Sequence, residues 1–168
     1  MSDVLAWQGI HSTFDPYLRL LGALLLAVPV GWDRERHGDT MGLRTFPLVS
    51  MGACAFILIG NTFIGSQAPD AMARILQGLM TGIGFVGGGA ILKHDKRVSG
   101  TAAAASIWVV GAIGAAVGFG YWGFALALSL FNLVAMWLLG WLKKHSGLAE
   151  HQEKTAAKDQ DQDEDQSD

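Results

Sequence analysis

Long apolar stretches alternate with short charged ones along this chain, and their lengths predict helices that cross a membrane. The first three run from Leu18 to Trp32, from Phe46 to Gly65 and from Ala71 to Leu92. The second and third are long enough to span about 30 Å of hydrocarbon as helices, whereas the first has to recruit flanking residues. Asp15-Pro16 supplies an N-cap and an N1 proline, which predict that the first helix begins there.

The last apolar stretch, residues 101–142, contains no charged residue. As one helix it would be about 63 Å long, roughly twice the thickness of a bilayer, so it predicts a helical hairpin. Gly118-Phe119-Gly120 supplies the turn, which places the last two spans at 102–118 and 121–142. The predicted fold class is therefore all-α, a polytopic membrane helix bundle of about five transmembrane helices.

Basic residues predict how this bundle is oriented. In the apolar body of the chain, all but two fall in the loops 33–44, 93–100 and 143–149. The alternate side has only Arg19, whose long stem can reach back to the interface, and Arg74. The positive-inside rule then puts the N-terminus outside and the C-terminus in the cytoplasm.

Charge and spacing also divide the chain into three parts. We expect residues 1–15 to form an extracytoplasmic segment and residues 16–145 a transmembrane domain. Residues 146–168 are predicted to be a disordered acidic cytoplasmic tail, because residues 150–168 carry 8 acidic residues against 2 basic ones and no large apolar groups. The N-terminal segment has no basic n-region and no small-residue cleavage site, so no cleaved signal peptide is expected.

Composition supports a membrane protein and excludes several kinds of chemistry. Of the 168 residues 51% are hydrophobic and 16% charged, and the mean hydropathy is +0.31. The single cysteine, Cys54, excludes an intrachain disulfide, and the five histidines form no zinc pattern. With no catalytic triad, P-loop or basic helix, we expect neither an enzyme nor a nucleic-acid partner. The expected partners are the lipid bilayer and either another membrane protein or a second copy.

A charged junction, residues 31–45, separates the first two spans. Within it Asp33 and Glu35 cannot share a helix face, whereas Asp33 has the spacing to pair with Arg36 or His37. One interpretation is therefore that the charges neutralise one another and anchor the helix end at the membrane surface.

The other interpretation of the charged junction is functional. Asp33 could hold a hydrated Mg²⁺ ion, for which one or two carboxylates suffice, or it could pair with Arg44 across the loop. Asp33 is the candidate metal ligand, and Glu35, Arg44 and Thr45 are the further candidate ligand residues at the junction. Topology already accounts for Arg34, so no functional role is predicted for it.

One helical face of the third span is polar, because Arg74, Gln77 and Thr81 lie near i, i+3 and i+7. We expect this face to point into the bundle. There it either hydrogen-bonds Asn61 or Asn132 on other helices or lines a permeation path. Gln77 and Asn132 therefore join the candidate ligand residues.

Glycines gather in the third and fourth spans. Residues 82–87 match G-x-G-x-x-G, but the motif lies in an apolar span without the strand and amphipathic helix that a pyrophosphate site needs. The run Gly87-Gly88-Gly89 either packs against another helix or breaks its own helix and exposes carbonyl groups to an ion. Small-xxx-small spacing predicts close helix packing at Gly78, Gly82, Gly84, Gly114 and Gly118.

Three blocks of sequence occur in an order that is typical of one family. They are Gly31–Arg36 with Gly42–Thr45, then Gly82–Gly89, then Val98–Trp108. With these blocks, about residues 17–142 resemble the membrane domain of the MgtC/SapB family. The resemblance implies a bacterial inner-membrane protein of Mg²⁺ homeostasis or of acid, phosphate or host stress. A Mg²⁺ carrier and a regulator that binds ATP synthase or a P-type Mg²⁺ pump are both implied.

The chain departs from the family pattern in three places. Asp33 stands where the family often has Glu, and Ala102-Ala103 replace the usual threonines, so a role for those hydroxyls does not carry over from the resemblance. The sequence ends in the acidic segment rather than in the soluble C-terminal domain of longer members. Regulation through that domain is therefore not expected.

Overall fold

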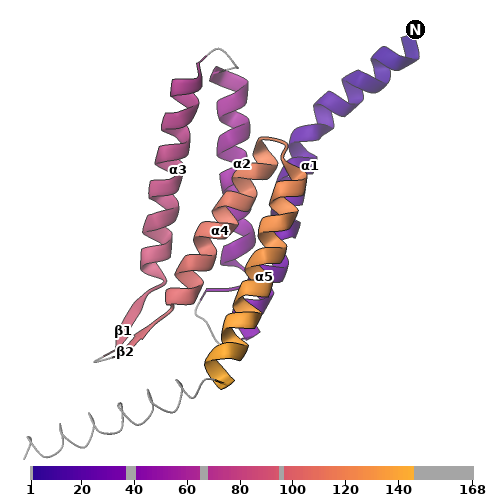
Figure 1. The fold of residues 1–168 in the computed structure, drawn as a ribbon. Coiled ribbons are helices and arrows are strands. Elements are labelled where there is room, and N and C mark those ends of the chain that lie inside the picture. The colour runs from indigo at the N-terminus through magenta and orange to yellow at the C-terminus, as the bar shows by residue number, and fades with distance from the viewer. Residues whose placement is uncertain (1, 37–40, 65–67, 95–96, 146–168) are drawn as a thin grey trace, which may run out of the picture. The chain divides into compact units, whose positions relative to one another are not determined.

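A computed structural model describes residues 2–36, 41–64, 68–94 and 97–145. The acidic segment 146–168 and His37 lie outside the described residues. The predicted helical membrane bundle is confirmed, with two short strands that the sequence pattern did not predict (Figure 1). The elements are α1 (Ser2–Arg36), α2 (Thr45–Ile64), α3 (Pro69–Gly89), β1 (Leu92–His94), β2 (Arg97–Ser99), α4 (Thr101–Gly118) and α5 (Trp122–His145).

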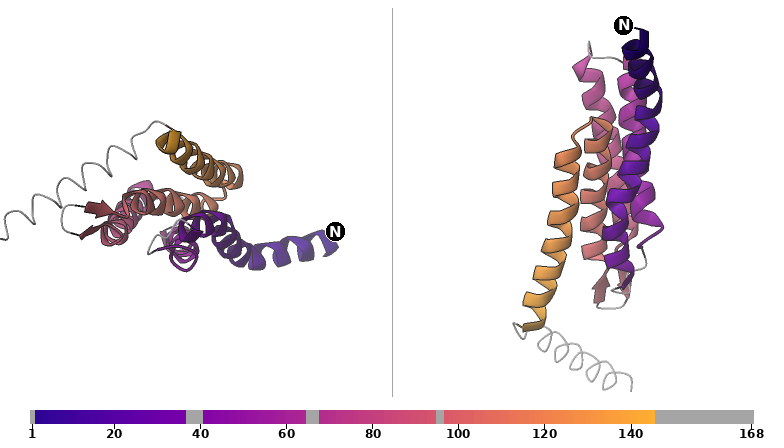
Figure 2. Two further views of the ribbon diagram at one scale, coloured as in Figure 1. Left: turned by 90° about the horizontal axis from the view of Figure 1, so that it is seen from below. Right: turned by 90° about the vertical axis from the view of Figure 1, so that its right-hand side faces the viewer.

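Four helical segments in the described part of the chain are long and apolar enough to cross a membrane. They are Phe14–Arg36, Thr45–Ile64, Thr101–Gly118 and Trp122–Leu142. Helix α3 is not among them, because its charged and amide side chains and its glycines lower its hydropathy. It nevertheless packs against α2 and α4, and its 21 residues, about 31 Å, run beside α2 (Figures 1 and 2). The assignment of α3 as the fifth predicted span is therefore supported by its packing beside α2 and not by its hydropathy.

Helix α1 begins earlier than predicted. It starts at Ser2 and crosses the predicted boundary at residue 15, with Pro16 inside the helix rather than at its first position. A proline there removes one intrahelical hydrogen bond, and the helix nevertheless continues through this position. Asp15 does not cap the helix; its carboxylate accepts a hydrogen bond from Nε of Arg19 at 2.6 Å.

Arg19 ties α1 to the end of α4. Its Nη1 donates to the carbonyl oxygen of Gly118 at 3.0 Å. A cation is favourable at this position, because the C-terminal carbonyl groups of a helix carry partial negative charge.

The turn between α4 and α5 lies where the sequence placed it. Gly120 has φ +86°, a left-handed conformation that glycine adopts without a steric cost. The amide of Tyr121 donates to Ala116 O at 2.8 Å, and that of Gly120 donates to Val117 O at 2.9 Å. This pair of bonds is a Schellman motif, and it ends α4 before the chain reverses.

Helices α3 and α4 are joined by the antiparallel pair β1–β2, in which Lys93 lies opposite Val98. The third apolar run was predicted to be helical as far as Leu92, but α3 ends at Gly89. Three consecutive glycines favour helix poorly, which explains the earlier end.

The core lies where α1, α2 and α4 pack together. Gly114 and Gly118 of α4 make this close approach possible, because a Cβ on Gly114 would overlap the Ser50 carbonyl oxygen, and one on Gly118 would lie 2.7 Å from Ile57 Cβ. The Ser50 hydroxyl donates to Ala23 O at 2.7 Å and so links α2 to α1. These contacts make α4 the central helix of the bundle (Figure 2).

The chain divides into two compact units, residues 1–133 and 134–168. Helix α5 begins in the first unit, where the Ser129 hydroxyl donates to Leu26 O of α1 at 2.8 Å. In the second unit the Trp141 and His145 rings lie 4.5 Å apart within the last turns of the same helix.

Candidate functional site: the charged junction and helix α3

Asp33 and Arg34 form an ion pair at the end of α1. Nη2 and Nε of Arg34 lie 2.5 and 3.2 Å from Asp33 Oδ2. Arg34 is only 6% exposed, so the pair is largely shielded from solvent on its cationic side. The predicted pairing of Asp33 with Arg36 is not what forms, because Arg36 lies over the Trp32 ring instead, 5.1 Å from its centroid.

The phase of helix α1 explains why Arg34 is buried. Ala23, Ala27 and Val30 are buried, and their spacing of four and three residues continues with a further step of four to Arg34. These four residues share one helical face, whereas Asp33 is rotated away from it. The spacing in the sequence indicates this burial, whereas the positive-inside rule alone predicts that Arg34 anchors the helix at the membrane surface.

Glu35 connects the end of α1 to the start of α2. Its Oε2 accepts the backbone N–H of Leu43 at 2.8 Å. The Gly42 carbonyl accepts the N–H groups of Thr45 and Phe46, each at 3.1 Å, which starts α2. A Cβ on Gly42 would lie 2.8 Å from Glu35 Oε2, so the glycine is required by this close approach. The junction is thus a tight joint between two helices.

The structure does not bring together the two residues that the sequence paired across the loop. Asp33 contacts Arg34, and Arg44 is exposed just before α2. Thr45 begins α2 with its backbone engaged. In the described ranges, no group of three or more His, Cys, Asp and Glu side chains is placed to hold a metal. The Asp33 carboxylate already has a cation beside it, and an incoming Mg²⁺ would compete with the Arg34 guanidinium.

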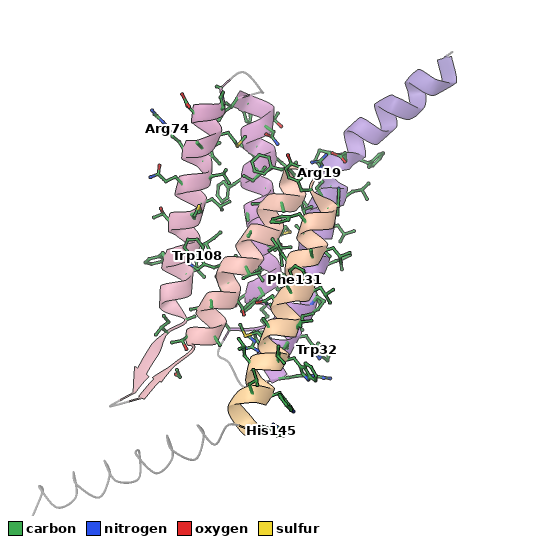
Figure 3. The ribbon with its side chains drawn as sticks, in the orientation of Figure 1. Arg19, Trp32, Arg74, Trp108, Phe131 and His145 are labelled. Carbon is green, nitrogen blue, oxygen red and sulfur yellow. The ribbon has the colours of Figure 1, made fainter. Side chains whose placement is uncertain are left out.

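The polar face of α3 points away from the bundle, contrary to expectation. Arg74, Gln77 and Thr81 are all exposed, and Figure 3 shows Arg74 directed away from the other helices. The apolar side of α3 faces inward instead: Ile83 is buried, and a Cβ on Gly111 of α4 would overlap it. A helix with one apolar stripe buries that stripe, so the polar residues are left on the opposite side.

Surface grooves of about 500 Å³ flank α3 on its two sides. One lies between α2 and α3, is mostly apolar, and includes Arg74, Gly78 and Gly82 in its lining. The other includes Gln77, Thr81 and the Trp108 ring of α4. A Cβ on Gly78 or Gly82 would meet no atom within 4 Å, so these two glycines do not make a helix contact within the chain.

The remaining glycines of α3 are also placed by the structure. Gly84 lies near Trp108, with 3.7 Å from a Cβ to the ring, and Gly87 is buried against α4. The carbonyl oxygens of Gly87 and Gly88 accept the N–H groups of Ala90 and Ile91 at 3.0 and 3.2 Å. Gly89 is exposed at the last position of the helix. These carbonyls therefore take part in ending α3, and the run does not interrupt the helix before its end.

Asn132 lies in the core, away from α3. It is 6% exposed, and its Oδ1 accepts the Ser106 hydroxyl of α4 at 3.4 Å. Its Nδ2 is the only buried side-chain nitrogen or oxygen in the described residues that lacks a hydrogen-bond partner. The predicted hydrogen bond from the polar face of α3 to Asn132 does not form, and Asn61 is exposed.

The fold and the junction together define a multi-pass α-helical membrane protein. The profile of the MgtC family matches residues 20–145, and the chain belongs to that family. It is 36% identical to Protein SrpB of Synechococcus elongatus over 77% of this chain and 74% of that protein. It is 39% identical to Protein MgtC of Salmonella typhimurium over 74% of this chain, and 32% identical to the putative magnesium transporter YhiD of Escherichia coli over 71%.

Coverage of these relatives is partial. The match spans 52% of the Salmonella protein and 58% of the Escherichia coli protein, so the chain spans about half the length of those relatives. No solved structure matches the chain. The activities of those longer relatives therefore apply to this chain only as proposals.

Proposed function

We propose that this protein serves Mg²⁺ homeostasis in the bacterial inner membrane by binding another membrane protein, and that it does not carry Mg²⁺ through its own bundle. The name of the Escherichia coli relative, a putative magnesium transporter, supports the link to magnesium. The packing of the helices supports the regulatory form of the proposal over the carrier form.

The observation that carries the regulatory form is the apolar filling of the space between α1, α2 and α4. Ala27, Val30, Ile57, Ile107 and Val110 are all buried there. Mg²⁺ gives up its water reluctantly and needs oxygen ligands in a near-octahedral arrangement. Alkyl side chains offer no such ligands, so a hydrated ion would have to separate the packed helices to pass.

The engagement of Asp33 points the same way. Its carboxylate contacts the buried Arg34 guanidinium, so binding a Mg²⁺ ion would replace one cation by another. Drawing Asp33 away is costly, because it breaks an ion pair whose guanidinium is shielded from solvent. We assign Asp33 and Arg34 to stabilising the end of α1.

A carrier is the second candidate function, and the name of the Escherichia coli relative favours it. In that case Asp33 would leave Arg34 during each transport cycle and bind the ion. Charge-neutral Asp33→Asn would then stop Mg²⁺ movement while keeping the shape of the side chain.

Liposomes separate the two candidates. The purified chain is reconstituted with a Mg²⁺-sensitive dye inside, and a Mg²⁺ gradient is applied to wild type, Asp33→Asn and the exposed control Thr62→Ala. The proposal expects all three to match protein-free liposomes. Mg²⁺ entry through wild type and Thr62→Ala that Asp33→Asn abolishes would overturn it and establish a carrier.

The regulatory form also requires a result in cells. In a strain that lacks its own family member, expression of the chain should restore growth at limiting Mg²⁺. A photo-crosslinker at the exposed Phe131 should then join it to a single membrane protein in near-stoichiometric yield. Restored growth with no crosslinked protein, at Phe131 and at other exposed positions, would contradict the proposal.

A further inference from the structure

The groove between α2 and α3 combines an apolar body with a charged end. It has a volume of about 500 Å³ and a mostly apolar lining. Gly52 of α2 and Gly78 and Gly82 of α3 line it, and a Cβ on any of the three would meet no atom within 4 Å. Arg74 lines one end, in the second turn of α3 (Figure 3). The chain therefore leaves this groove open along the glycines, with a cation at its end.

The length of the groove matches one half of a bilayer. Along α3 its lining runs from Arg74 to Val86, which is about 18 Å at 1.5 Å per residue. The hydrocarbon of one leaflet is about 15 Å deep. Helix α2 is long and apolar enough to span the membrane, and α3 packs beside it. The groove therefore runs along the direction of the acyl chains, and one acyl chain fits its apolar part by length and by chemistry.

Two opposite charges follow one another at the end of the groove. Asp70 lies in the first turn of α3, one turn before Arg74 and about 6 Å nearer the start of the helix. A spacing of four residues puts both on one side of the helix, and both are exposed. Among the residues that the structure describes, no hydrogen bond or ion pair engages either side chain. From the middle of the membrane toward its surface, the order is apolar groove, cation, anion.

A zwitterionic aminophospholipid has the complementary order. Its acyl chains come first, its phosphate next and its ammonium group last. The guanidinium of Arg74 is suited to the phosphate, because it offers two parallel N–H donors. The ammonium group has three N–H donors, and the Asp70 carboxylate accepts them. The lipid and the groove are thus matched at three successive levels.

The same two charges disfavour other headgroups. An anionic headgroup without an ammonium group would pair with Arg74 but would bring a second negative charge close to Asp70. A choline headgroup carries its positive charge on a methylated nitrogen, which has no N–H group to donate to the carboxylate. The pair Asp70 and Arg74 therefore selects among lipids that share the same acyl chains.

We infer that the groove between α2 and α3 is a binding site for phosphatidylethanolamine. One acyl chain lies along Gly78 and Gly82, the phosphate lies at Arg74 and the ammonium group at Asp70. The inference goes beyond the proposed function and is independent of it, because it rests on the outer side of α3 and not on the charged junction or on any movement of Mg²⁺.

Native mass spectrometry of the full chain tests the inference. The protein is released from detergent micelles that contain phosphatidylethanolamine, phosphatidylglycerol or phosphatidylcholine with identical acyl chains, and the lipid-bound fraction is followed against lipid concentration. One molecule of phosphatidylethanolamine should bind about tenfold more tightly than either other lipid, which is the contribution of one charge-assisted hydrogen bond. Equal affinities for the three lipids, or tighter binding of phosphatidylglycerol, would overturn the inference.

A groove-filling variant locates the bound lipid. Gly78→Leu places a side chain in the groove, and Gly123→Leu at the start of α5 is the matched control, because a Cβ on either glycine would meet no atom within 4 Å. Gly78→Leu should lower the affinity for phosphatidylethanolamine about tenfold, whereas Gly123→Leu should bind it as wild type does. Unchanged binding by Gly78→Leu, or a second copy or another protein bound to the groove in place of the lipid, would contradict the inference.

Charge variants then test the order of the two headgroup contacts. Asp70→Asn should lower the affinity for phosphatidylethanolamine to that for phosphatidylcholine and leave the latter unchanged. Arg74→Gln should weaken the binding of all three lipids, because each carries a phosphate. A misfolded variant would not lose its selectivity while keeping its affinity for one lipid. An Asp70→Asn variant that still prefers phosphatidylethanolamine would show that the carboxylate does not bind the ammonium group, and it would contradict the inference.

Discussion

Helices α3 and α4 are neighbours of similar length, but they differ in how much of their surface is buried. Most of α4 is buried, on faces that contact α1, α2 and α3, whereas only Ile83 and Gly87 are buried in α3. Both helices are rich in glycine. Atoms of neighbouring helices occupy the space beside each glycine of α4, whereas most glycines of α3 have no atom within 4 Å of a Cβ position. The same residue type therefore serves the interior of the bundle in one helix and its outer surface in the other.

The largest effect should come from adding a methyl group where α4 meets α2. In Gly114→Ala the new Cβ would overlap the Ser50 carbonyl, which is backbone and cannot rotate away. We expect the free energy of unfolding to fall by about 3 kcal/mol, the upper end for overpacking. Chemical unfolding in detergent micelles measures this change.

The matched control for Gly114→Ala is Gly82→Ala on α3. Its Cβ would meet nothing within 4 Å, and alanine favours helix over glycine by about 1 kcal/mol. The variant should be as stable as wild type or slightly more stable. Equal losses in the two variants would break the contrast between the helices.

A second contrast lies within the charged junction. Arg34→Ala removes a 6%-exposed guanidinium and its ion pair with Asp33, so we expect a loss of about 2 kcal/mol in the free energy of unfolding. Arg44→Ala removes an exposed side chain and should change stability by less than about 0.5 kcal/mol. If the Arg44 variant were the less stable of the two, the structural role assigned to Arg34 would be wrong.

A smaller effect is expected from the hydroxyl that links α2 to α1. Ser50→Ala removes the buried hydrogen bond to Ala23 O and should cost about 1 kcal/mol, as interhelical hydrogen bonds in membrane proteins do. Thr62→Ala removes a comparable hydroxyl bond to Leu58 O on the exposed end of the same helix and should cost less. Thermal unfolding of both variants in one detergent tests the difference.

The hairpin of α4 and α5 could be predicted from the sequence, because two constraints act together there. An uncharged stretch twice the thickness of a bilayer has to turn, and Gly120 supplies the left-handed residue that ends α4. The start of α1 could not be predicted in this way. Asp15-Pro16 is a local signal for a helix start, and the structure continues the helix through it. The orientation across the membrane stays a prediction.

The candidate site was harder to predict, because two general rules about membrane proteins conflict with the helix geometry of this chain. Intramembrane polar residues usually face a bundle interior, which placed Arg74 and Gln77 inside. That rule refers to the whole assembly and not to one chain. The positive-inside rule places Arg34 at the membrane surface, whereas the helical spacing places it on the buried face of Ala23, Ala27 and Val30.

The central claim is that the polar face of α3 lies outside the packed interior of its own chain. The most direct measurement is the unfolding temperature of Gln77→Leu as a monomer in detergent micelles, beside Gly114→Ala. The account predicts a Gln77→Leu value equal to or above that of wild type, because the exposed amide has no hydrogen-bond partner in the described residues to lose. A decrease as large as that of Gly114→Ala would mean that Gln77 packs inside the bundle, and it would contradict the account.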